Sequence, residues 1–227
     1  MLAWLQNNSA LLGELTLAHA RLAGIPIIAG FVISVPLGWM ASKNAAVRGF
    51  LLSVGNVAYT IPSLALFVTL PAILGTRALD EANVVVALTI YAVAVMVRSA
   101  ADAFGAVDQQ VRDAATAMGT TAWQRFLRVE LPLSGPVLLA GIRVVSVSTV
   151  SLVSVGALIG SGGLGYLFTN GFQRNYPEQI LVGMVAIILL ALVFDLALAG
   201  LGRLSMPWRR ALRPVGEPRR GRALAAA

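Results

Sequence analysis

The chain has 227 residues, of which 58% are hydrophobic and only 12% charged, and its formal net charge is +7. Soluble domains carry about 25% charged residues, so this composition excludes an ordinary soluble enzyme and a disordered chain and favours an integral membrane protein. Cysteine is absent and His19 is the only histidine, which excludes disulfides and thiolate or multi-histidine metal sites, and we predict no bound metal.

Five apolar stretches approach the roughly 20 residues that a membrane-spanning helix needs. Residues 1–20, which precede them, are only mildly apolar and have no early cation, so we expect an interfacial lead-in helix rather than a signal peptide. His19 is expected to lie at that interface. The third stretch becomes long enough if the charged side chains of Arg98 and Asp102 reach the interface. The five predicted spans are residues 22–40, 50–70, 84–97, 137–159 and 180–201.

Lysine and arginine are distributed unevenly between the two sides of these spans. With the N-terminus outside, the outer segments contain only Arg21, Arg77 and Arg174, whereas seven arginines lie in the last 25 residues alone. The positive-inside rule therefore predicts a multi-pass protein of the bacterial cytoplasmic membrane with its C-terminus inside. We predict one transmembrane domain over residues 21–205 and a disordered basic tail over 206–227. That tail suits anionic membrane lipid better than nucleic acid, which we do not expect as a partner.

The long inner loop predicts two short helices that meet at an angle. Gly119 fits the left-handed residue that ends a helix. Thr121 and Gln124 have the spacing of a capping box that begins a second helix, and Pro132 fits the first turn of the following span. The small residues between 111 and 126 bury too little area for a helix that rests on a membrane. A docking surface for the groove of a partner protein is the better interpretation.

This loop resembles the EAA loop of ABC-importer permeases. That motif contains Glu-Ala-Ala, a glycine four residues later and an Ile-x-Leu-Pro ending, and this chain departs from it only by Asp for Glu and Val for Ile. The Gly-rich stretch 157–165 is similar to one in the same family, and residues 59–66 look like the second span of its osmoprotectant branch. The matching loop residues are Asp113, Ala114, Ala115, Gly119, Val129, Leu131 and Pro132, with Trp123-Gln124 also typical.

The resemblance implies an all-α integral membrane fold, the five-helix core of a type I ABC-importer permease with a cytoplasmic coupling-helix loop at about residues 108–131. It implies uptake of osmoprotectants or quaternary amines (glycine betaine, carnitine, choline) that an extracellular or periplasmic binding protein delivers. The loop would dock on an ABC ATPase dimer. The implied ATPase-coupling residues are Asp113, Ala114, Ala115, Met118, Gly119, Trp123 and Pro132.

The energy source must be another chain. A P-loop requires a glycine-rich turn followed by Lys-Ser/Thr, and the only lysine, Lys43, is followed by Asn44. We therefore predict a transport subunit that is not an enzyme and has no cofactor of its own, with ATP and Mg on the partner ATPase. Five spans are too few to enclose a channel, so a second permease copy or a paralogue is expected.

Two charges lie inside the predicted spans, Arg143 in the fourth and Asp195 in the fifth. They lie at similar depths from the inner face, and isolated intramembrane charges usually pair or face water, so we predict that they pair. Pro62 should kink the second span. Small and hydroxyl residues more often pack helices than line a path, but several are candidates for a pathway or gate. These candidates are Tyr59, Pro62, Ser63, Ser151, Ser154, Gly160, Ser161 and Gly162.

Two other functions remain open at this point. A permease for an amino acid such as methionine would share the same loop and differ only in cargo. Half of a dimeric secondary transporter belongs to a different class, although such carriers commonly show inverted repeats, and we find none. Co-purification of an ATPase would distinguish an ABC permease from a secondary carrier.

Overall fold

The computed structural model describes residues 2–210, and they form helices joined by short connections. Within this range, four helical stretches are long and apolar enough to cross a membrane: α2 (Ser9–Ala41), α5 (Glu81–Gly105), Ala122–Ile159 and α10 (Pro177–Ser205). A fifth candidate is the bent pair α3 (Ala45–Thr60) and α4 (Ser63–Leu74). This agrees with the predicted all-α membrane core.

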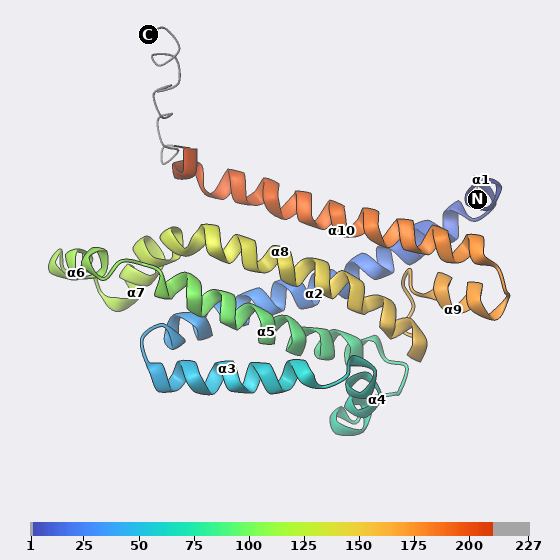
Figure 1. Ribbon diagram of the computed structural model, residues 1–227, viewed down its shortest axis with the longest axis horizontal. Helices are drawn as coiled ribbons and strands as arrows, with labels where there is room; N and C mark the ends of the chain where they lie inside the picture. The colour runs from blue at the N-terminus through green and yellow to red at the C-terminus, as the bar shows by residue number, and fades with distance from the viewer. Residues whose placement is uncertain (1, 211–227) are drawn as a thin grey trace, which may run out of the picture.

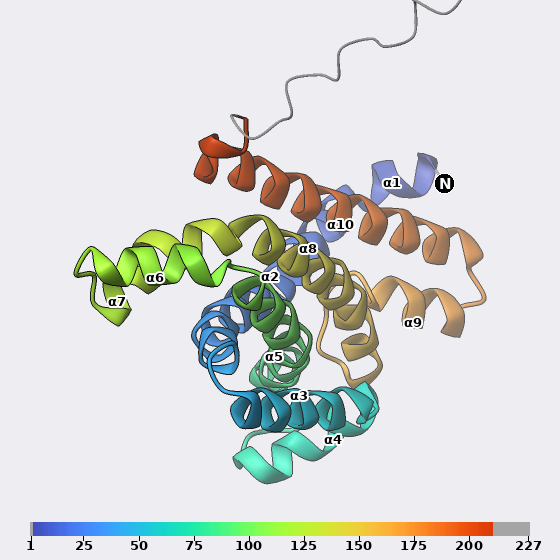
Figure 2. The same cartoon turned by 60° about the vertical axis from the view of Figure 1, so that its left-hand side comes forward.

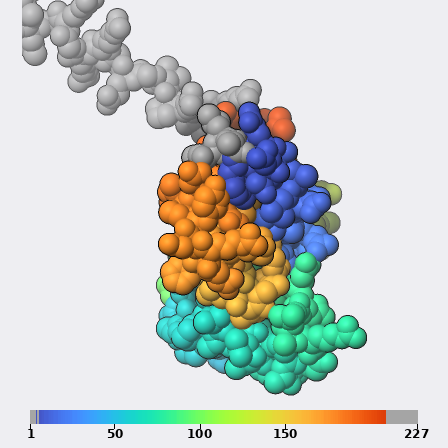
Figure 3. All heavy atoms as spheres, turned by 90° about the vertical axis from the view of Figure 1, so that its right-hand side faces the viewer, coloured from blue at the N-terminus to red at the C-terminus, as the bar shows by residue number. Residues whose placement is uncertain are grey.

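The long helices lie side by side along the long axis of the molecule, with smaller helices at both ends (Figure 1). α6 (Gln109–Ala117) and α7 (Ala122–Arg125) occupy one end, which we call the α6 end. α4, α9 (Tyr166–Gln173) and the start of α10 occupy the other, which we call the α9 end. Seen from the α9 end, the surface of α2 lies next to that of α9 and α10, and the segment that contains α4 lies below them (Figure 3).

The first helix is longer than predicted. A separate short helix, α1 (Leu2–Asn7), is followed at once by α2, which begins at Ser9 rather than near residue 22. Most of the predicted lead-in 1–20 is therefore continuous with the first span. Trp4, Leu12 and Leu15 pack against the main apolar core, which explains why this mildly apolar segment remains helical and joined to the bundle.

The second predicted span is broken rather than kinked. α3 ends at Thr60, α4 begins at Ser63, and the two axes differ by 102°. The residue before a proline is sterically driven to extended backbone, and Ile61 indeed has ψ 128° before Pro62. The predicted effect of Pro62 is thus correct in position, but it turns the chain instead of bending one helix.

α5 lies at the centre of the bundle and contacts α2, α3, α4 and α8 (Leu131–Gly156) (Figure 2). Its closest neighbour is α2, because glycines on α2 leave room for the α5 backbone. A Cβ atom added at Gly38 would lie 2.3 Å from the Cβ of Ala100, and one at Gly30 would lie 2.5 Å from that of Ala92. Small residues spaced in this way allow membrane helices to approach closely.

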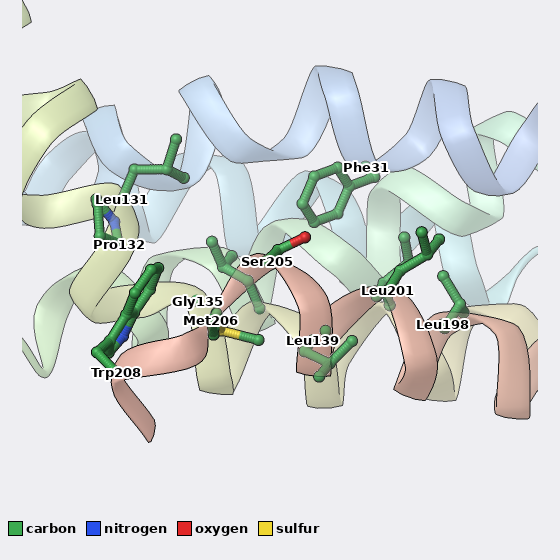
Figure 4. Close-up of a pocket in the computed structure, with 13 residues that line it drawn as sticks. Phe31, Leu131, Pro132, Gly135, Leu139, Leu198, Leu201, Ser205, Met206 and Trp208 are labelled. Carbon is green, nitrogen blue, oxygen red and sulfur yellow. The ribbon is translucent and has the colours of Figure 1, made fainter. Parts of the chain in front are cut away.

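α10 lies along one side of the bundle and contacts α8, α9 and α2. Near the α6 end, an apolar groove of about 480 Å³ separates it from α8 and α2 (Figure 4). Pro132, a predicted coupling residue, lies in the first turn of α8 and lines this groove rather than the exposed surface of the loop. Of the predicted tail 206–227, Met206 is buried, residues 207–210 form a 3-10 turn, and the rest lies outside the described residues.

Candidate functional site

The loop at the α6 end begins with α6, whose two ends are fixed by local hydrogen bonds. The Asp108 carboxylate accepts from the backbone N–H of Gln110 at 2.8 Å. At the other end Gly119 has φ +80°, a left-handed conformation that favours glycine. The N–H of Gly119 donates to the carbonyl of Thr116 at 2.9 Å. The predicted end of the first loop helix is confirmed.

A new helix then starts at an angle to α6. The Thr121 side chain accepts from the N–H of Gln124, and the Gln124 side chain accepts from the N–H of Thr121, so the predicted capping box is present. α7 continues into a wide helical turn, η1 (Phe126–Glu130), before α8. Such π-type turns occur often at functional sites. The result is a pair of short helices that projects from the bundle (Figure 2).

Most of the predicted coupling residues lie on the surface of this pair. Met118 is 77% exposed and Trp123 is 60% exposed, and Asp113, Ala114 and Gly119 are exposed as well. We call these five residues the docking face. A surface of small residues flanked by two large apolar side chains suits the groove of another protein.

Ala115 is an exception. It is only 2% exposed, so its methyl group is directed into this chain and not towards a partner. Its carbonyl accepts hydrogen bonds from the backbone N–H and the hydroxyl of Thr120, which tighten the turn after α6. Its prediction as a contact residue is therefore wrong, because neighbouring positions on a helix point in different directions.

Below the loop lies a buried carboxylate that the sequence analysis did not single out. Glu130 is fully buried and accepts from the indole N–H of Trp39 at 3.0 Å and from Nε of Arg125 at 3.0 Å. Nζ of Lys43 lies 3.9 Å from it, and Nε of Arg112 lies 4.0 Å away. A carboxylate next to the apolar start of a span could have marked Glu130 in the sequence as a residue that needs a partner. Its partner Trp39 could not be identified in this way, because it is 91 residues away.

The two intramembrane charges meet, as predicted. Nε and Nη2 of Arg143 donate to the two carboxylate oxygens of Asp195, both at 2.6 Å. The pair is partly exposed, with 42% of the Arg143 side chain and 23% of that of Asp195 accessible. It borders an open hollow of about 450 Å³ that Ser148 also lines. Exposure of a charge pair to lipid is expensive, so this face of α8 and α10 is suited to water or to another protein.

Comparison with known proteins decides the family. Residues 21–211 match the family described as the binding-protein-dependent transport system inner membrane component. The chain belongs to this family. Among its relatives, the carnitine transport permease protein OpuCB of Listeria monocytogenes is 32% identical over 88% of this chain and 91% of its own length. The osmoprotectant import permease protein OsmW of Salmonella typhimurium is 31% identical over 85% and 90%.

Solved structures show the same fold. A chain of the inward-facing MetNI methionine ABC transporter aligns with 87% of this permease and 97% of itself, with a TM-score of 0.76 and 23% identity. A chain of an amino acid ABC transporter aligns with 87% and 95%, with a TM-score of 0.70 and 16% identity. The choline transport permease OpuBB of Bacillus subtilis, 31% identical over 86% of this chain and 89% of its own length, is a further relative by sequence.

The pathway candidates of the permease fall into separate groups. Tyr59, 51% exposed, lies edge-on to Tyr91 with ring centroids 5.9 Å apart. Tyr91 donates to the carbonyl of Ile61, the residue at the α3–α4 break, at 2.5 Å. Ser148 lines a small hollow with both tyrosines and also the hollow beside Arg143. Pro62 and Ser63 form the break itself, whereas Ser151 and Ser154 line neither hollow.

The Gly-rich stretch of the permease forms a tight turn at the α9 end. Gly160, Gly162 and Gly163 have φ of +82°, +78° and +72°, and Ser161 between them is 5% exposed. Directly below Gly163 lies His19, which is fully buried rather than interfacial as expected from the sequence.

His19 joins three parts of the permease that are distant in sequence. Its Nε2 lies 2.9 Å from the carbonyl of Val150, and the N–H of Leu164 donates to its Nδ1 at 3.1 Å. Because a carbonyl can only accept and an amide N–H can only donate, Nε2 carries the proton and Nδ1 is the acceptor. The ring thus fastens α2 to α8 and to the turn after it. In residues 2–210, no group of three or more potential ligand side chains could hold a metal ion.

Proposed function

We propose that this chain is the permease subunit of an ATP-driven importer that takes up osmoprotectants or quaternary amines such as glycine betaine, carnitine and choline. The observation that carries the cargo class is its likeness, over nearly the full length of both chains, to permeases named for carnitine, choline and osmoprotectant transport. The methionine alternative finds support only in fold, at 23% identity.

The docking face is the proposed contact with an ABC ATPase dimer, which would bind ATP and Mg and supply the energy. Its exposed small residues and two exposed large side chains support this role, and so does its separation from the long helices (Figure 1). Closure of the ATPase dimer would move α6 and, through it, the spans, in a rigid-body transition between inward- and outward-open states.

The α6 end is then the cytoplasmic end, and the α9 end faces the external binding protein. Support comes from the cations: the predicted positive-inside orientation puts the C-terminus inside, and α10 ends at the α6 end (Figure 1). The turn at Gly160, Ser161 and Gly162 would form part of an outer gate. If a membrane-impermeant thiol reagent labelled a cysteine placed at Gln110 in intact cells, this orientation would be wrong.

The cargo path would follow the face of the bundle that carries Tyr59, Ser148 and the Arg143–Asp195 pair. A second permease copy or a paralogue would cover the partly exposed charge pair from the other side. The exposed ring of Tyr59 offers a π-face to a quaternary ammonium group, and the remaining candidates, Ser151 and Ser154, serve helix packing or a wider path.

The docking claim can be tested by Ala114→Trp, which adds bulk to an exposed position of α6 without backbone strain. At Gly119 the positive φ would add strain of its own. We expect the co-expressed ATPase subunit to be lost from the purified complex, and uptake of radiolabelled glycine betaine, carnitine or choline to fall at least tenfold. Ala46→Trp, an exposed helical alanine in the first turn of α3, is the matched control and should keep uptake within twofold.

Wild-type uptake and a fully retained ATPase in Ala114→Trp would show that the docking face is not the contact. A complex that transports methionine but none of the three amines would reject the cargo class and leave the permease assignment in place.

A further inference from the structure

Glu130 occupies the place where the docking loop meets the first long helix. One carboxylate oxygen accepts a hydrogen bond from Nε of Arg125 in α7 at 3.0 Å and lies 3.9 Å from Nζ of Lys43, just beyond α2. The other oxygen accepts from the indole N–H of Trp39, near the end of α2, at 3.0 Å and lies 4.0 Å from Nε of Arg112 in α6. One fully buried side chain therefore contacts both short helices of the loop and the end of a span.

The surrounding contacts reinforce this junction. Arg125 also donates to the hydroxyl of Thr116 in α6 at 2.6 Å, which ties the two short helices together. The ring of Phe126 packs against Trp39 at 4.8 Å between centroids and against Trp123 of the docking face at 5.1 Å. The contact between loop and span thus has an ionic part and an aromatic part, and both end on Trp39.

The ionic contacts between the loop and α2 all depend on the single negative charge of Glu130. Three cations from three segments lie around one carboxylate, and removing one partner of a buried ionic group leaves the others uncompensated. Without a negative charge there, Lys43, Arg112 and Arg125 would repel one another. The loop and the end of α2 would then lose their shared ligand while each remained helical.

We infer that Glu130 is a positioning residue for energy coupling: it transmits the displacement of α6 to the inner end of α2. This rests on the proposed function, in which the docking face receives the ATPase. Two segments that share one buried carboxylate move as one body, so a push on α6 reaches the span directly. Loss of the carboxylate charge should let α6 move while α2 stays behind.

The test uses the whole complex, with ATPase and binding protein, in proteoliposomes. In Glu130→Gln, a side chain of the same size that keeps an acceptor for Trp39, we expect the ATPase to co-purify and ATP hydrolysis to stay within threefold of wild type. Cargo taken up per ATP hydrolysed should fall at least tenfold. Glu81→Gln makes the same change at an exposed ion pair with Arg21 and should leave that ratio unchanged.

A distance measurement separates coupling from simple support of the fold. The chain has no cysteine, so single cysteines at Gln110 of α6 and Met40 of α2, both exposed, can carry spin labels. In the wild type the distance distribution should stay narrow when ATP and vanadate are added. In Glu130→Gln it should become at least twice as wide under the same conditions.

Trp39→Phe is the second variant, because it removes the indole N–H and keeps a smaller aromatic ring beside Phe126. It should lower uptake per ATP several-fold, and it decides the question if Glu130→Gln does not accumulate in the membrane. An unchanged ratio in these variants, or equal losses of hydrolysis and uptake, would overturn the coupling role. If Ala114→Trp also leaves the ATPase bound and uptake unchanged, the docking face is not the ATPase contact, and that part of the proposed function fails instead.

Discussion

The two ends of the bundle are each held by one buried polar side chain, but the chemistry differs. At the α6 end Glu130 is a carboxylate among Arg125, Arg112 and Lys43. At the α9 end His19 is an imidazole between a carbonyl and an amide N–H, with no charged partner among residues 2–210. Both are fully buried, and both join segments more than 90 residues apart.

The difference suits what each end has to do. Ionic contacts hold over a range of distances and orientations, because Coulomb attraction falls off slowly with separation, so the α6 end can shift and stay connected. A histidine with one donor and one acceptor fixes its neighbours only in a single arrangement. The contrast therefore predicts that α6 and the end of α2 move together at the α6 end, whereas the turn above His19 at the α9 end keeps its own shape.

The Arg143–Asp195 pair is the strongest challenge to this contrast, since it places charge halfway along α8, away from both ends. Arg143→Asp or Asp195→Arg alone should reduce uptake at least tenfold, because either change puts two like charges against each other at that depth. The double charge-swap variant should recover several-fold over either single change. If the double variant transports no better than the singles, the pair contributes nothing as a pair.

The α9 end can be broken by His19→Ala. The change leaves the N–H of Leu164 without its acceptor and opens a cavity below Gly163, so we expect a loss of roughly 2–4 kcal/mol in the free energy of unfolding. Denaturation in detergent would measure it. Leu17→Ala, at a 74% exposed position of the same helix, is the control and should change little.

His19→Gln sharpens the result, because the amide side chain can both donate and accept and should recover part of the loss. Wild-type stability in His19→Ala would mean that the turn at Gly160–Gly163 is held by its own backbone, and the supposed rigidity of the α9 end would have to be explained without the histidine.

Features that depend on neighbouring residues were predictable from the sequence. The left-handed Gly119 and the capping box of Thr121 and Gln124 follow from local backbone rules, and both are present. At Pro62 the position of the disruption was predictable, but the expected kink is a complete break. The pairing of Arg143 with Asp195 was predictable although the two residues are 52 apart in the sequence. The rise per residue of a membrane-spanning helix gives the depth of each charge below the inner face, and the two depths are similar.

The missed residues depend on contacts that no local rule supplies. Glu130 meets Trp39 across 91 residues, and His19 meets Leu164 across 145. A single buried histidine or glutamate has no periodicity, so the sequence gives its type but not its partner. Ala115 failed for a related reason: the motif names adjacent alanines together, although only the packing of α6 decides which of them faces outwards.

The smallest effect concerns the surplus of positive charge around Glu130. Burial lowers the pKa of Lys43 below its usual range, the attraction of Glu130 opposes this, and the repulsion of Arg125 and Arg112 adds to it. Between the folded pKa and the usual lysine pKa, the unfolded chain binds more protons, so stability rises with pH across that alkaline window. In Lys43→Gln this rise should be absent.

Because Lys43 is a third exposed, we expect the rise to stay below about 1 kcal/mol. Denaturation curves of wild type and Lys43→Gln at matched pH values would isolate it, since the two chains are identical at every other position. Loss of Lys43 should also leave uptake per ATP near the wild-type value, because Arg112 and Arg125 still hold Glu130. A large drop in uptake per ATP would mean that all three cations around Glu130 are required for coupling. The ionic contacts at the α6 end would then be as specific as the hydrogen bonds of His19.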